Sequence, residues 1–159
     1  MNITRRHLIA AVPLLATSVH RAAAQAALSG TFKGNGKPAS LTQVVAYKGN
    51  PESDQPIIEL VFTAKNQGND PKAAFNALFN KYGDALVVKI FPDGKVYSAD
   101  LVHANLQSPS GSITLLGILS IENFSTANGE LSGRLTSAGP RNARDQKFDI
   151  DLTFRTKAP

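Results

Sequence analysis

The sequence predicts an all-β domain, mainly antiparallel with about eight strands, folded as a small barrel or sandwich and carrying one short amphipathic helix. Short apolar or β-branched runs recur roughly every 8 to 12 residues between clusters of Gly, Pro, Asn and Asp, which is typical of such folds. Turn dipeptides join neighbouring runs and favour antiparallel pairing. Only one segment has helical periodicity. The hairpin-by-hairpin order favours a meandering barrel over a Greek key.

The first 26 residues are typical of a cleavable export signal, which leaves a single β-rich domain over residues 27–159. The apolar run Leu8–Val19 has only 12 residues, whereas a membrane-spanning helix needs about 20. Small residues after this run predict cleavage after Ala24 or Ala26. We expect no membrane span in the mature chain, because no other stretch is apolar enough.

A pair of arginines stands just before the apolar run. Arg5 and Arg6 follow Thr4 and precede the hydrophobic Leu8 and Ile9, so the segment resembles a twin-arginine signal. That resemblance implies that the Tat export machinery of a bacterium carries the folded protein into the periplasm.

The expected strands are Leu28–Lys33, Leu41–Tyr47, Ile57–Ala64, Ala85–Phe91, Lys95–Ala104, Ile113–Phe124, Glu130–Ser137 and Lys147–Arg155. The first two are predicted to pair across a turn at Asn35-Gly36, and residues 49–56 are predicted to form a loop. Further hairpins are expected at Pro92-Asp93-Gly94 and at Asn128-Gly129. Gly117 predicts a bulge or bend.

Two expected strands differ in how they face the core. The run IIELVFTA is apolar enough to be covered on both faces. The last strand alternates apolar and polar residues, which predicts one buried and one solvated face.

The one predicted helix begins with Asp70 as N-cap and Pro71 at its first position. Four apolar side chains at helical spacing share one face and are expected to lie in the core: Phe75, Leu78, Phe79 and Tyr82. Gly83 is predicted to end the helix.

Two short motifs carry a second resemblance. Ala77-Leu78-Phe79 on the helix and the Gly-rich hairpin at residues 128–135 resemble small uncharacterised periplasmic domains of bacteria. The resemblance covers about half of the mature chain and implies no activity.

Composition excludes several kinds of function. With the three leader arginines set aside, 14 basic and 12 acidic residues nearly balance and are spread singly, which argues against nucleic-acid binding. The chain has no Cys, so thiolate metal sites and cysteine nucleophiles are excluded. We predict no metal site and no cofactor.

His103 is the one histidine left after the leader, so a catalytic triad or a single-metal site would depend on it. Strand alternation places Tyr97 on the same face as His103 and Asp100 on the other. The ordinary alternative is a strand-end histidine bonded to backbone or water.

Arg141 and Arg144 lie in a predicted ten-residue loop, Ser137–Gln146, that could bind a carboxylate or phosphate or be merely solvated. With no catalytic motif, we expect a non-enzymatic, exported periplasmic module that binds a small ligand or a protein partner. The alternative is an exported accessory subunit or small enzyme that uses His103 or these arginines.

Overall fold

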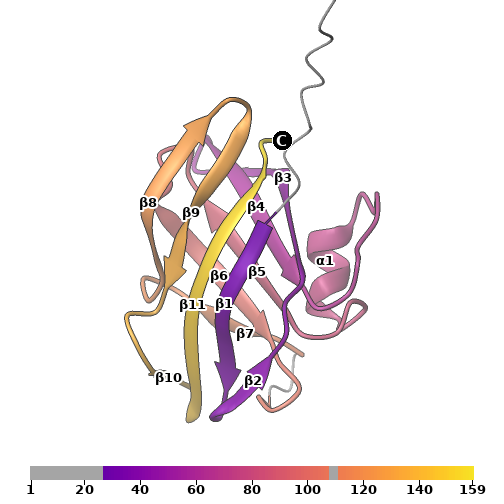
Figure 1. The fold of residues 1–159 in the computed structure, drawn as a ribbon, viewed down its shortest axis with the longest axis vertical. Helices are drawn as coiled ribbons and strands as arrows, with labels where there is room; N and C mark the ends of the chain where they lie inside the picture. Colours follow the sequence, from indigo (N-terminus) through magenta and orange to yellow (C-terminus); the bar gives the residue numbers. More distant parts are fainter. Residues whose placement is uncertain (1–26, 108–110) are drawn as a thin grey trace, which may run out of the picture.

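The computed structural model describes residues 27–107 and 111–159, which form two stacked β-sheets with one short helix on the outside (Figure 1). The predicted antiparallel all-β fold with one helix is confirmed, as a sandwich. The two sheets do not close on one another in this part of the chain, so the meandering barrel is wrong. The predicted leader, with Arg5, Arg6 and cleavage after Ala24 or Ala26, lies outside the described residues.

Sheet A brings the first and last strands of the described chain together. In order of pairing it contains β2 (Lys37–Ala39), β1 (Ala27–Gly34), β11 (Gln146–Lys157), β9 (Glu130–Thr136) and β8 (Ser120–Ala127), and β10 (Arg141–Ala143) also pairs with β11. Every pair is antiparallel.

Sheet B is a meander of consecutive strands. It contains β3 (Gln43–Glu52), β4 (Gln55–Thr63), β5 (Ala85–Ile90), β6 (Val96–Val102) and β7 (Ile113–Leu115), again antiparallel throughout. The short strands β2, β7 and β10 raise the number of described strands to eleven, above the eight or so expected.

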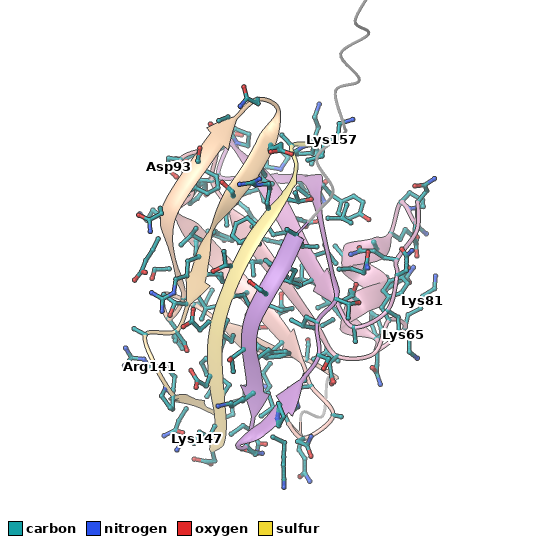
Figure 2. The ribbon with its side chains drawn as sticks, in the orientation of Figure 1. Lys65, Lys81, Asp93, Arg141, Lys147 and Lys157 are labelled. Carbon is teal, nitrogen blue, oxygen red and sulfur yellow. The ribbon has the colours of Figure 1, made fainter. Side chains whose placement is uncertain are left out.

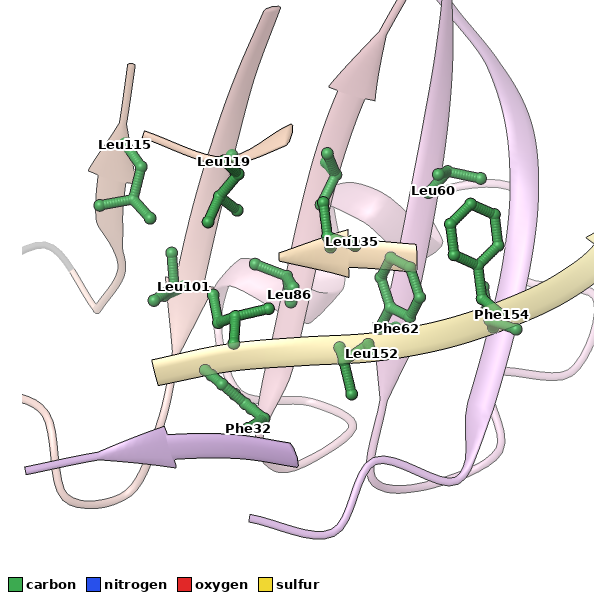
Figure 3. Close-up of a cluster of buried hydrophobic side chains, with 14 of the residues drawn as sticks. Phe32, Leu60, Phe62, Leu86, Leu101, Leu115, Leu119, Leu135, Leu152 and Phe154 are labelled. Atoms are coloured by element: carbon green, nitrogen blue, oxygen red, sulfur yellow. The ribbon is translucent and has the colours of Figure 1, made fainter. Parts of the chain in front are cut away.

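The core fills the space between the sheets. The predicted alternation of the last strand is confirmed, because Phe148, Ile150, Leu152 and Phe154 of β11 are all buried. They meet side chains of sheet B, and Phe62 and Phe154 pack edge to face with ring centroids 5.7 Å apart (Figure 3). The sandwich interior is thus occupied by side chains.

Asn-Gly turns close two hairpins where the sequence predicts them. Asn35 and Gly36 join β1 to β2, and Asn128 and Gly129 join β8 to β9, all with positive φ. This backbone shape matches the twist of two-residue hairpins and suits Asn and Gly. The hairpin of β5 and β6 around Pro92-Asp93-Gly94 is also confirmed.

Three expected connections are wrong. The segment after β2 does not pair with β1; as β3 it enters the other sheet and pairs with β4. Residues 49–56 are mostly the ends of these two strands, because the turn is made by Ser53 and Asp54, both with positive φ. The single run 113–124 is split where Gly117, φ 66°, lets the chain pass from sheet B to sheet A.

The helix, α1 (Ala73–Leu78), is shorter than predicted and presents a different face to the sheet. It buries Ala73 and Ala77 against β4 and β5, whereas Phe75 and Phe79 are 60% and 64% exposed. The aromatic stripe is therefore not core, apart from the buried Tyr82 beyond the helix. Small alanines let a six-residue helix approach the sheet closely, which the larger phenylalanines would prevent.

Candidate functional site

The predicted arginine loop is largely a regular hairpin, so the expectation of an irregular ten-residue loop is wrong. Arg141 begins β10, and Arg144 makes the turn to β11 with Asp145, both at positive φ. Arg141 Nε donates to the Ser137 carbonyl oxygen at 2.9 Å. Figure 2 places Arg141 and Lys147 at one end of the sandwich and Asp93 and Lys157 at the other.

His103 directly follows β6 and is 4% exposed. Its Nδ1 accepts a hydrogen bond from the Asn105 N–H at 3.0 Å, which assigns the proton of the neutral ring to Nε2. The ring packs edge-on against Phe32 and over Gly34, where a Cβ would lie 2.7 Å away. Within the described residues, Nε2 is buried without a hydrogen-bond partner. Such a group calls for a structural or functional explanation.

A polar pocket of about 740 Å³ lies beside His103, at the Lys147 end of the sandwich. Amide side chains of Asn80, Gln107 and Gln146 line it. Gln146 Oε1 accepts hydrogen bonds from Asn35 Nδ2 at 2.9 Å and from the Gln107 N–H at 3.1 Å. The pocket thus lies between the chain after α1, the loop after β6 and the start of β11, and Gln146 links it to the turn of β1 and β2.

The structure does not bring the predicted site residues together. Tyr97 lies near the other end of β6, roughly 20 Å from His103 by strand geometry, where it is 41% exposed and packs on Phe91. Neither Arg141 nor Arg144 lines the His103 pocket. Asp100 lies on the outer face of sheet B, as predicted, and accepts a hydrogen bond from a threonine hydroxyl of β7.

A second concave site lies where α1 rests on the outer face of sheet B, and one carboxylate fixes the helix there. Asp70 accepts hydrogen bonds from the Lys72 N–H at 2.9 Å, Asn76 Nδ2 at 2.8 Å, Lys81 Nζ at 2.9 Å and the Tyr82 hydroxyl. These hydrogen bonds, with that of Tyr82 the strongest, hold the pKa of Asp70 well below its usual range.

The helix covers only part of the outer face and leaves a cleft beside it. It packs over Val61 and Val87, but the next row toward the β3–β4 turn stays uncovered. In that row Tyr47, Glu59 and Lys89 stand directly opposite one another on β3, β4 and β5. The resulting α1 cleft has a volume of about 440 Å³, and its lining includes those three residues with Phe75, Leu78 and Asp100.

Glu59 is the electrostatically unusual residue of the α1 cleft. Burial raises the pKa of its carboxyl above the usual range, and the positive charge of Lys89 on the neighbouring strand opposes that rise. Lys89 Nζ lies instead 3.3 Å from Glu52 Oε1. Among the described residues, the carboxylate of Glu59 has neither a hydrogen bond nor an ion pair.

Tyr47 forms another wall of the α1 cleft and is held from behind. Its hydroxyl donates to Gln67 Oε1 at 3.2 Å, and Gln67 Nε2 donates to the Val61 carbonyl oxygen at 3.0 Å. Burial raises the pKa of the Tyr47 hydroxyl. The wall is therefore fixed before any ligand arrives, which reduces the entropy lost on binding.

Sequence reasoning missed the α1 cleft. Glu59 stands inside the run IIELVFTA, whose composition predicts that both faces are covered, and helical periodicity predicts that Phe75 lies in the core. The one available signal was a lone carboxylate in a strand otherwise apolar on both faces.

The chain matches no protein-family model, and comparisons with curated proteins and with solved structures find no match. Among residues 27–107 and 111–159, no helix is long and apolar enough to cross a membrane. The same residues contain no group of three or more His, Asp or Glu side chains placed to hold a metal ion.

Proposed function

We propose that this protein is an exported periplasmic binding module that holds a small amphipathic ligand in the α1 cleft. The observation that carries the proposal is the cleft itself: a concave site whose lining combines apolar side chains such as Phe75 and Leu78 with an equal number of polar and charged ones. Its volume of about 440 Å³ falls within the range of small-molecule sites, about 300 to 1,000 Å³, and its mixed lining suits a ligand with both a polar and an apolar part. Export is proposed from the twin-arginine pattern at Arg5 and Arg6.

The exposed phenylalanines support a binding role. Phe75 and Phe79 stack with ring centroids 4.8 Å apart and stay largely in water. Burying an apolar side chain of this size is worth roughly 1.5–3 kcal/mol, and a ligand seated against Phe75 would recover part of it. A pair of adjacent exposed aromatics is typical of an interaction site rather than of ordinary surface.

Fragment binding followed by ¹⁵N-resolved NMR tests the cleft. We expect small aromatic fragments to shift the amides of Tyr47, Glu59 and Phe75, and Phe75→Ala to weaken binding by about five- to tenfold. Leu116→Ala is the matched control, because Leu116 is also exposed and apolar but does not line the cleft. Fragment shifts confined to the His103 pocket, or equal losses in both variants, would overturn the assignment.

Export is tested separately with the leader. Residues 1–26 fused to a reporter that folds in the cytoplasm should carry it to the periplasm, and the double variant Arg5→Lys/Arg6→Lys should stop it. Arg21→Lys serves as the control. Unchanged export of the native fusion in cells without the Tat machinery would overturn this part of the proposal.

One observation favours a second function, an accessory subunit or small enzyme that uses His103. The buried Nε2 without a partner is the kind of unsatisfied group that a ligand would complete. His103→Asn keeps an acceptor for the Asn105 N–H but removes Nε2. Native mass spectrometry of protein taken from the periplasm decides: a bound mass lost in His103→Asn but kept in Phe75→Ala would favour this second function.

A further inference from the structure

We propose that the ligand of the α1 cleft is an organic cation, an amine or guanidinium on an apolar body, with Glu59 as its counter-ion. The proposal rests on the proposed function, because it names the chemical class that the cleft takes. It rests on a difference among the charged groups at the cleft: most of them already have a partner, and Glu59 has none within the described residues.

Most charged groups near the cleft floor already have partners. Lys89 is paired with Glu52, and Asp100 accepts a hydrogen bond from the Thr114 hydroxyl. Glu59 is half-buried between Tyr47 and Lys89 and has no hydrogen bond or ion pair in the described chain. A partly desolvated carboxylate without a donor is unfavourable, so a cationic donor placed there would be attracted strongly.

The walls beside Glu59 suit a cation that carries an apolar group. Tyr47 stands directly opposite Glu59 on the neighbouring strand, and Phe75 lines the same cleft from α1. Aromatic faces attract ammonium and guanidinium groups and also cover apolar carbon. The carboxylate and the rings would thus act on the two ends of one amphipathic molecule.

The lysines of the cleft do not argue for an anionic ligand. Lys48 and Lys72 line the cleft but are exposed, so water and salt screen their charges. Glu59 is less exposed, and its charge is therefore screened less. The third lysine, Lys89, is half-buried, but its charge is already paired with Glu52. Of the two half-buried charges at the cleft floor, Lys89 is paired and Glu59 is not, so the charge left for a ligand is negative.

Three probes with the same phenyl group test the charge preference: phenethylamine, 2-phenylethanol and 3-phenylpropanoate. Each is titrated into the ¹⁵N-labelled protein at constant ionic strength, up to about 20 mM. We expect phenethylamine to bind at least tenfold more tightly than the alcohol and the acid to bind weakest. A tenfold ratio corresponds to about 1.4 kcal/mol.

Two variants locate the preference. Glu59→Gln keeps the shape of the side chain and should remove the advantage of the amine over the alcohol. Asp145→Asn, which makes the same charge change at the β10–β11 turn, should leave that advantage unchanged.

The outcomes separate the two proposals. Equal binding of all three probes at the cleft, unaltered by Glu59→Gln, would overturn the cationic ligand and leave the cleft as a binding site. No shift of a cleft amide by any probe would overturn the proposed function as well. An amine preference that persists in Glu59→Gln would show that another group is the counter-ion.

Discussion

The Tyr82 hydroxyl donates a hydrogen bond to the Asp70 carboxylate and so ties the chain after α1 to the chain before it. Lys81, next to Tyr82, reaches the same carboxylate. A helix of six residues is too short to persist alone in water. The position of α1, and with it the cleft, therefore depends on these hydrogen bonds to Asp70 and on the two buried alanines.

Replacing Asp70 should release the helix without unfolding the sandwich. Asp70→Asn removes the charge that Lys81 and Tyr82 share, so we expect faster hydrogen exchange of the α1 amides while β5 and β11 keep their protection. Tyr82→Phe, which keeps the buried ring, should have a smaller effect of the same kind. Equal loss of protection in the strands would show that the helix and the sandwich unfold together.

Acid should loosen α1 in the same way. Hydrogen bonds lower the pKa of Asp70 in the folded state below its ordinary value of 3.8. Its contribution to the stability of α1 is therefore complete at a pH above 3.8 and is lost as the pH falls toward the folded-state pKa. Hydrogen exchange of α1 measured at a series of pH values should show protection that falls below this value. In Asp70→Asn that pH dependence should be absent.

Glu59 should have the opposite effect on stability. Its pKa is raised by burial, so the ionised side chain costs stability, and the cost grows as the pH rises from 4.5 through the folded-state pKa. Glu59→Gln should therefore melt at a higher temperature than the native protein at pH 7, and the gap should close below pH 4.5. A variant that is less stable at pH 7 would contradict an unfavourable carboxylate at this position.

Two asparagines at equivalent turns should differ in importance. Asn35 and Asn128 both occupy positive-φ positions before Gly, but Asn35 also bonds to Asn105, Gln146 and Lys147. We expect Asn35→Ala to lower the free energy of unfolding by about 1–2 kcal/mol more than Asn128→Ala does. Urea denaturation measures both, and equal losses would mean that the Asn35 side-chain bonds add nothing.

Two phenylalanines allow the core to be separated from the exposed surface. Phe154 is buried against Phe62, so Phe154→Ala should cost about 3–5 kcal/mol of unfolding free energy. Phe79 is exposed at the C-terminal cap of α1, and Phe79→Ala should change the free energy of unfolding by no more than about 0.5 kcal/mol. A large loss at Phe79 would mean that the aromatic pair on the helix supports the fold.

Some of the fold could be predicted because local chemistry determines it. The alternation in β11 fixes which face is buried, and the dipeptides Asn35-Gly36 and Asn128-Gly129 fix two turns through their backbone preferences. The choice of sheet that each strand joins, in contrast, depends on contacts between residues far apart in the sequence. The chain after β2 could extend the first sheet or cross to the second, and only packing against β4 decides that it crosses.

The helix and its cleft could not be predicted for a related reason. Hydrophobicity alone assigns Phe75 and Phe79 to the core, but the gap above the outer face of sheet B accepts Ala73 and Ala77. Glu59 could not be singled out either, because it stands in an apolar run and is half-buried only where the short helix stops covering the sheet. For the helix, side-chain size against a particular surface, rather than periodicity, decides which residues are buried.

The pairing of β1 with β11 also determines how the protein can assemble during synthesis. Sheet B consists of consecutive strands and can form while translation continues, but β1 must wait for the last described strand to emerge. Until β11 inserts between β1 and β9, the apolar inner face of sheet B has no complete cover. The nascent chain is therefore open to aggregation until β11 leaves the ribosome.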